Sequence, residues 1–149
     1  CTDAASIRNE LSRLIQLGYI TEEESTWVNA EKIAAFFRTD IGSKLVNGQQ
    51  VLREFKFSIL DDGEKYVSGM EGEQVLLQGV VDCALIEPDG ISVIDFKTNR
   101  VTEDTVSQVA EQYRSQVLVY ADALERIYNM PVKSAQLYFF RLNRFVTIR

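Results

Sequence analysis

The chain has 149 residues, of which 46% are hydrophobic and 26% charged, and its 16 basic and 22 acidic side chains give a net charge of −6. This length supports one domain, and the composition excludes a disordered chain, a collagen-like repeat and a disulfide scaffold. No apolar run approaches the roughly 20 residues that cross a bilayer and no signal peptide is evident, so we expect a cytoplasmic protein without a membrane contact.

The first third of the sequence predicts three helices. Apolar residues at helical spacing predict a helix over 5–17, and Gly18 is the residue expected to end it. Asn29 is expected to cap a second helix, and Asp40 a short third helix that ends at Asn47-Gly48.

The middle of the sequence predicts antiparallel strands. Apolar alternation or continuous apolar runs predict strands over residues 51–59, 75–86 and 91–97. The first should end at Asp61-Asp62-Gly63, before a polar loop over 64–73. Glu87-Pro88-Asp89-Gly90 is a turn sequence, so the second and third strands are expected to form a hairpin.

A long helix and two closing strands complete the predicted order. The helix runs from Thr102 to about Tyr128, and Pro131 stops it. Its expected core-facing residues are Val106, Val109, Tyr113, Val117, Leu124 and Ile127. Strands are predicted over 135–141 and 145–148. We therefore expect one α/β domain over 1–149, with a helical part over 1–49 and a core over 50–149.

Histidine is absent from the sequence, and the cysteines are Cys1 and Cys83. The absence of histidine excludes Ser-His-Asp triads, Cys-His dyads and histidine-ligated metals within this chain. Two cysteines are too few for a four-thiolate zinc or iron–sulfur site, and Cys83 lies in an apolar run that predicts a small buried thiol. Catalysis would therefore depend on carboxylates, lysine, tyrosine or serine.

The predicted hairpin brings carboxylates together. The period of two places Asp95 and Lys97 on the same face of their strand, and an unbulged hairpin sets Asp82 opposite Asp95, although a bulge at Gly90 would shift this pairing by one residue. Two carboxylates on one rung among apolar residues are unfavourable without a positive charge between them. Mg²⁺ or Mn²⁺ held by oxygen ligands would supply that charge. The alternative is a buried Asp–Lys ion pair with a purely structural role.

Three motifs in this order resemble those of the PD-(D/E)XK nucleases, in the RecB-type branch. Gly79-Val80-Val81-Asp82 resembles its G-x-x-D motif, and Ile94-Asp95-Phe96-Lys97-Thr98 its D-(F/Y)-K-T motif. The segment 112–120 resembles its Q-x-x-x-Y motif, and together with strand 137–140 the likeness is strongest to AddA-type nuclease domains. The resemblance covers residues 50–149. It implies a restriction-endonuclease-like core, a mixed central sheet with an antiparallel hairpin flanked by helices.

The resemblance also implies roles for individual residues. Asp82, Asp95 and the backbone carbonyl of Phe96 would be the metal ligands, and Lys97 the catalytic lysine, next to a scissile phosphate. Glu54 matches the first acidic motif of the family less securely. Its alternative is an exposed strand glutamate paired with Lys56 or Arg53.

The helix motif would support this site. Gln116 and Tyr120 are four residues apart and therefore share a helical face, from which they would support the catalytic residues or contact DNA. Gln112 is a weaker candidate one turn earlier, and Tyr120 has the alternative of lying at the edge of the core. The candidate phosphate contacts are Arg53, Lys56, Arg100, Arg114, Arg141 and Arg144.

As a whole, the resemblance implies a Mg²⁺-dependent DNA exonuclease domain of an ATP-dependent helicase–nuclease that acts in double-strand break repair and recombination. Its expected partners are single-stranded DNA or broken duplex ends, the helicase portion of the parent chain and a second nuclease subunit of the AddB type. Enzymes of this branch carry a metal-binding histidine on an N-terminal helix. We therefore expect that helix to precede Cys1 in a longer protein, and this fragment alone to bind metal weakly or be inactive. The alternative is a non-catalytic scaffold that binds DNA or a partner.

Overall fold

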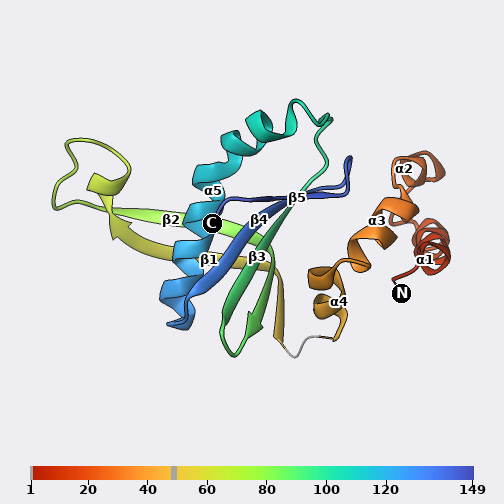
Figure 1. Ribbon diagram of the computed structural model, residues 1–149, viewed down its shortest axis with the longest axis horizontal. Helices are drawn as coiled ribbons and strands as arrows, with labels where there is room; N and C mark the ends of the chain where they lie inside the picture. Colours follow the sequence, from red (N-terminus) through yellow and green to blue (C-terminus); the bar gives the residue numbers. More distant parts are fainter. Residues whose placement is uncertain (1, 48–49) are drawn as a thin grey trace.

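The computed structural model describes residues 2–47 and 50–149. Its centre is a five-stranded mixed sheet in the order β1-β2-β3-β4-β5 (Figure 1). The strands are β1 (Gln50–Asp62), β2 (Gln74–Glu87), β3 (Gly90–Lys97), β4 (Val132–Phe139) and β5 (Arg144–Thr147). The parallel pair is β3 and β4, while β1–β2, β2–β3 and β4–β5 are antiparallel. The expected α/β class, with a mixed sheet and an antiparallel hairpin, is therefore confirmed.

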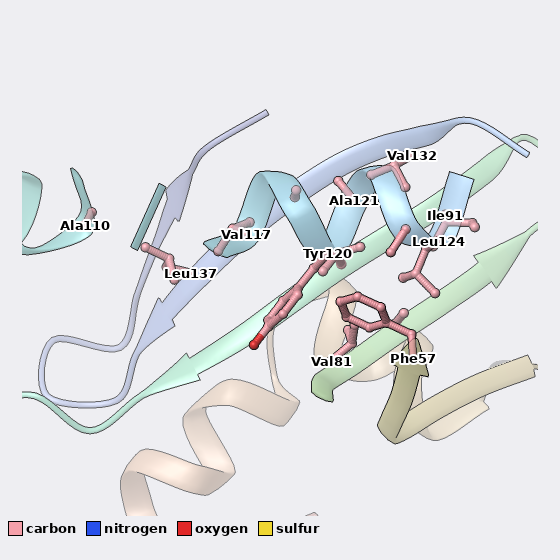
Figure 2. Close-up of a cluster of buried hydrophobic side chains, with 14 of the residues drawn as sticks. Phe57, Val81, Ile91, Ala110, Val117, Tyr120, Ala121, Leu124, Val132 and Leu137 are labelled. Carbon is pink, nitrogen blue, oxygen red and sulfur yellow. The ribbon is translucent and has the colours of Figure 1, made fainter. Parts of the chain in front are cut away.

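The helices divide between the faces of this sheet. Helix α5 (Val106–Tyr128) connects β3 to β4 and covers one face, where Val117, Ala121 and Leu124 pack against the strands in the largest core (Figure 2). A parallel pair needs such a crossover, because the chain must return from the end of the first strand to the start of the second, at the opposite end of the strands. The remaining helices are α1 (Ala4–Gln16), α2 (Glu22–Thr26), α3 (Ala30–Phe37) and α4 (Asp40–Asn47), with a short 3₁₀ turn η1 (Gly63–Lys65) after β1.

Helices α3 and α4 form a second core on the opposite face. Phe36 and Leu45 pack there against Ile94 and Tyr138, and Cys83 belongs to the same cluster. The Cys83 side chain is buried as expected, and burial raises the pKa of its thiol to about 11. Because a thiol with so high a pKa stays protonated near neutral pH, Cys83 is a packing residue.

One helix was missed in the sequence, and two others begin at different residues from those expected. Helix α2 was missed because it is a polar five-residue turn, held by a capping box between Thr21 and Glu24, and has no apolar periodicity. Thr39, and not Asp40, caps α4, since its hydroxyl accepts a hydrogen bond from the amide of Gly42 at 3.1 Å. Helix α5 starts at Val106 because the Thr105 hydroxyl accepts from the amide of Thr102 at 2.9 Å and holds the preceding residues in a turn.

The end of α5 differs from the expectation in the burial of one residue. Ile127 was expected in the core, but its side chain is 44% exposed, while the next residue, Tyr128, packs against the core beside Phe55 of β1. The helix then ends at Asn129, which adopts a left-handed conformation with φ 49, before Pro131. None of the described helices has the length and apolar character needed to cross a membrane.

The β1–β2 ribbon changes face near Glu54. The pairs Leu52–Ala84 and Phe55–Val81 both pack into the α5 core, although residues three apart on a regular strand point to opposite faces. Glu54 lies between them with a positive φ of 50, and the register lacks the rung that would join it to Asp82. One residue on each strand therefore falls out of alternation at this point.

The far end of the β1–β2 ribbon extends away from helices α1–α3 (Figure 1) and is held to α5 by a buried carboxylate. Asp61 accepts hydrogen bonds of 2.8 Å from both Lys65 and Tyr66, and Arg126 of α5 lies 3.3 Å away. The hydrogen bond from Lys65, with that from Tyr66, lowers the pKa of Asp61 to about 2. This network fixes the ribbon on the helix that also carries the site residues.

Candidate active site

The end of β3 carries a buried ion pair. Asp95 is 2% exposed, and its Oδ2 lies 2.5 Å from the Nζ of Lys97. The alternation of β3 places both side chains on the face that α5 covers, as expected, because Ile91 and Val93 of the same strand belong to the α5 core. No described donor makes a well-oriented hydrogen bond to this Oδ2, so the contact with Lys97 is a charge contact.

Asp82 meets this pair across the hairpin. The predicted register is confirmed, since β2 and β3 pair from Glu87–Gly90 to Cys83–Ile94 without a bulge at Gly90. The next rung would set Asp82 opposite Asp95, but the backbone ladder stops there. Instead, the Oδ2 of Asp82 accepts a hydrogen bond of 2.8 Å from the amide of Phe96. The carboxylate of Asp82 is therefore anchored directly beside the backbone of Asp95.

The surroundings of Asp95 disfavour its charged form. Burial raises the pKa of Asp95, the charge of Lys97 opposes this rise, and the negative charge of Asp82 adds to it. A positive charge placed between the two carboxylates would stabilise both anions.

Helix α5 supplies aromatic support for Lys97. The ring of Tyr113 lies 4.0 Å from the Lys97 Nζ, in cation–π geometry, and its hydroxyl accepts a hydrogen bond of 3.1 Å from the Asn99 side chain. The sequence assigned Tyr113 to the core stripe and missed this contact. A tyrosine one turn before a Q-x-x-x-Y motif was the available signal.

Gln116 and Tyr120 lie together on α5, as their spacing predicted. The Gln116 amide donates a hydrogen bond of 2.8 Å to the Tyr120 hydroxyl, and the Tyr120 ring packs edge-on against Phe57 (Figure 2). Burial raises the pKa of Tyr120, and the charges of Asp95 and Asp82 raise it further. Tyr120 is thus a neutral core residue whose hydroxyl faces the site. Gln112 is exposed and lies one turn before Gln116 on the helix.

Gly79 of the G-x-x-D motif has a steric role. A Cβ at this position would lie 2.7 Å from the Phe57 ring and 2.9 Å from the Tyr120 ring. The absence of a side chain therefore lets α5 lie close to β2 and brings Tyr120 to the site.

Gly79→Ala is expected to lower the free energy of unfolding by about 1–3 kcal/mol, because the added methyl group forces two packed rings apart. Urea unfolding followed by circular dichroism measures this change. Gln78→Ala, at the exposed neighbouring position, is the control and should change stability by less than about 0.5 kcal/mol. Equal stability of the two variants would contradict the steric role of Gly79.

Glu54 and Asp82 line one cleft of about 410 Å³, together with Phe36, Phe37 and Phe96. Within residues 2–47 and 50–149, neither Lys56 nor Arg53 forms an ion pair with Glu54. The same residues contain no group of three or more His, Cys, Asp or Glu side chains placed to hold a metal ion. The all-oxygen donors Asp82 and Asp95 thus match Mg²⁺ in chemistry, while a third side-chain ligand is not assembled there.

The predicted phosphate contacts lie on several elements. Arg114 pairs with Glu111 at 2.7 Å, and Arg144 pairs with Glu103. Arg53 lines the cleft with Glu54 and Asp82, Arg141 lines a separate cleft, and Lys56 and Arg100 are exposed.

An antiparallel hairpin that carries an aspartate on each strand, with a lysine two residues beyond the second, is the arrangement expected of the PD-(D/E)XK motif. The model of the PD-(D/E)XK nuclease superfamily matches residues 2–147, and the chain belongs to this superfamily. The resemblance drawn from the motifs is therefore confirmed.

Within this superfamily, the chain is similar to the A subunits of ATP-dependent helicase/nucleases. The chain is 38% identical over 98% of its length to the A subunit from Geobacillus thermodenitrificans. It is 32% identical over 96% of its length to the protein of the same name from Bacillus cytotoxicus, and 35% identical over 90% to that of a Thermoanaerobacter species. It spans 13%, 12% and 11% of these three relatives, so the comparison concerns one part of much longer proteins.

Proposed function

We propose that this chain hydrolyses phosphodiester bonds of DNA, as the metal-dependent nuclease domain of an ATP-dependent helicase–nuclease. The observation that carries the proposal is the buried Asp95–Lys97 pair at the end of β3, with Asp82 anchored beside it. The superfamily match over residues 2–147 and the names of the relatives support it.

The residues of the site would divide the chemistry among them. Asp82, Asp95 and the carbonyl of Phe96 would hold a Mg²⁺ ion, for which Mn²⁺ could substitute, and Glu54 would border it from β1. A divalent ion bound there supplies a Lewis acid and lowers the pKa of a bound water. Lys97, held between Asp95 and the Tyr113 ring, would offset the negative charge that develops on the phosphate.

The names of the relatives support a helicase portion in a longer parent protein, and we propose the rest of the wider setting. We assign to the parent protein a helicase portion, a second nuclease subunit of the AddB type, exonucleolytic action on single-stranded DNA or broken duplex ends, and a role in double-strand break repair and recombination. Cytoplasmic location stays a prediction.

A second function, a non-catalytic scaffold that binds DNA or a partner, is favoured by one observation. The described residues assemble no three-ligand metal cluster, and the sequence contains no histidine. A scaffold would keep the fold and the Asp95–Lys97 pair without binding a divalent ion.

Calorimetric titration of Mn²⁺ and Mg²⁺ into the folded chain tests the proposal. The chain is expected to bind Mn²⁺ or Mg²⁺, and Asp82→Ala and Asp95→Ala are each expected to abolish binding, because each removes a carboxylate ligand. Asp104→Ala, at an exposed position in the turn before α5, is the control and should bind like the wild type.

The scaffold function predicts the opposite result. Equal binding by the wild type and both site variants would contradict the assignment of Asp82 and Asp95 as ligands. If a wild-type chain shown to be folded binds no metal, the same variants are compared in the longer parent protein, where equal metal binding would contradict the assignment. Added linear single-stranded DNA, followed for degradation in the same samples, reports cleavage.

A further inference from the structure

A second cleft of about 520 Å³ lies between the start of α3 and the residues that follow β3 and β4. Its walls include Trp27, Asn29 and Lys32 on one side and Thr98, Phe140 and Arg141 on the other. This volume lies within the range of about 300–1,000 Å³ that is typical of small-ligand sites. The nuclease motifs do not account for most of these residues.

Trp27 is the most unusual residue of this cleft. It is the single tryptophan of the chain, and its side chain is 73% exposed at the end of α2. Its amide donates to the carbonyl of Glu24 at 3.1 Å, so the backbone that carries the ring is held in the last turn of the helix. It belongs to none of the described core clusters. A large aromatic ring on a fixed backbone, open to solvent, is a suitable surface for stacking a base.

The charged residues of the cleft are both cations. Lys32 and Arg141 line it, and no carboxylate of the described residues does, although the whole chain has a net charge of −6. The Lys32 ammonium donates a hydrogen bond to the backbone carbonyl of Arg141, which holds the two positive residues on neighbouring walls. No ion pair of the Arg141 guanidinium is found in the described part of the chain. The cleft is therefore complementary to an anion.

The cleft adjoins the end of β3. Thr98 follows Lys97 directly in the chain, and the amide of Phe140 donates to the carbonyl of Lys97 at 3.1 Å. The ring of Phe140 stacks on that of Phe96, with centroids 5.6 Å apart and an interplanar angle of 29°. Phe96 in turn lines the cleft that contains Asp82 and Glu54, so these two stacked rings join the two clefts.

We propose that this cleft binds single-stranded DNA, with one base stacked on the indole of Trp27 and a neighbouring phosphate between Lys32 and Arg141. Stacking platforms combined with cations are the common means of binding single strands without sequence preference. The strand would pass Thr98 toward Lys97. In this respect the inference rests on the proposed nuclease function and adds a substrate-binding surface to it.

Because Trp27 is the sole tryptophan, its fluorescence reports stacking directly. The 149-residue chain is titrated with oligothymidylate in the presence of a chelator, so that no divalent ion is needed and no strand is cut. Saturable quenching of the tryptophan emission is the expected result. Unchanged emission at saturating oligothymidylate would overturn the proposal.

Variants then identify the contacts, with binding measured by the anisotropy of a labelled oligothymidylate. Trp27→Ala is expected to weaken binding about 5- to 150-fold, and Trp27→Phe, which keeps a ring, should restore most of it. Tyr19→Ala is the matched control, because Tyr19 is also exposed, at 74%, and lies outside the cleft. An equal loss in Tyr19→Ala and Trp27→Ala would contradict the assignment.

The salt dependence of binding tests the roles of Lys32 and Arg141. Lys32→Gln and Arg141→Gln should each lower the slope of log K against log salt concentration by about 0.7, the value for one phosphate contact of a single strand. Lys65→Gln, at the far end of the β1–β2 ribbon, should leave the slope unchanged. A wild-type slope retained in both cleft variants would show that no phosphate lies there.

Three further outcomes distinguish this inference from self-association and from the nuclease proposal. If the emission of Trp27 changes with protein concentration alone, and sedimentation detects a dimer that Trp27→Ala abolishes, the cleft is a self-association surface and the proposal is wrong. If oligothymidylate quenches the emission but the longer parent protein does not cleave DNA, the cleft is retained and the nuclease proposal is rejected. If the parent protein cleaves DNA but oligothymidylate does not quench the emission, the nuclease proposal is retained and the cleft is rejected.

Discussion

Replacing Asp95 by asparagine is expected to lower the rate of metal-dependent DNA cleavage by the proposed parent helicase–nuclease by about 10²–10³-fold. Asparagine keeps the size of the side chain but removes the negative charge that would hold the ion and orient Lys97, 2.5 Å away. Degradation of a linear DNA with ATP and Mg²⁺ measures the rate.

The design of this test separates catalysis from folding. Helicase activity of the same preparation should be unchanged, since the helicase portion lies outside this chain in the proposed parent. Asp104→Asn, an exposed aspartate in the turn before α5, is the matched control and should cleave at the wild-type rate. Cleavage within a factor of about two of the wild type in Asp95→Asn would refute the assignment of Asp95.

Lys97→Met is expected to lower the free energy of unfolding by about 3 kcal/mol at neutral pH without metal, because it leaves the carboxylate of Asp95 buried without its cation. That carboxylate belongs to a residue that is 2% exposed. Asp95→Asn should lower the free energy of unfolding by less than about 1 kcal/mol. The Lys97 side chain is more exposed than that of Asp95, at 13%, and it keeps its contact with the Tyr113 ring, so its charge is less costly to leave without a partner. Urea unfolding in the presence of a chelator measures both values.

The double variant completes a double-mutant cycle, and a lysine elsewhere on the sheet is the control. Asp95→Asn combined with Lys97→Met should be more stable than Lys97→Met alone, since the unpaired charge is then absent. Lys56→Met, an exposed lysine of β1, should change stability by less than about 0.5 kcal/mol. If the Asp95 and Lys97 variants were equally destabilised, the pair would be a symmetric structural ion pair, and the site would not be prepared for a cation.

The hairpin that carries Asp82 and Asp95 was predictable because its signals are local. Glu87-Pro88-Asp89-Gly90 determines the turn, and the turn determines which residues of β2 and β3 face each other. The period of two then places Asp95 and Lys97 on one face without any knowledge of the rest of the molecule. For the same reason Asn29 was recognised as the cap of α3, where its side chain accepts from the amide of Lys32.

Other features depend on contacts between distant residues and could not be predicted. Nothing in the alternation of β1 indicates that Glu54 adopts a φ of 50, and this conformation moves Leu52 and Phe55 to the same face. The exposure of Ile127 depends on which face of the last turn of α5 packs on the sheet, and Tyr128 takes that place. Thr39 replaced Asp40 as the cap of α4 because the two neighbouring residues are both good caps and the backbone conformation decided between them.

The superfamily and the candidate carboxylates could be inferred from the residues alone, because turns, strand alternation and short motifs act over a few residues. Three contacts became evident in the folded molecule: the hydrogen bond from the Phe96 amide to Asp82, the Tyr113 ring against Lys97, and the cleft that Trp27 shares with Arg141. Each of them joins segments 14 or more residues apart. The last two depend on how the helices pack against the sheet, and that packing depends on the shapes of many side chains at once.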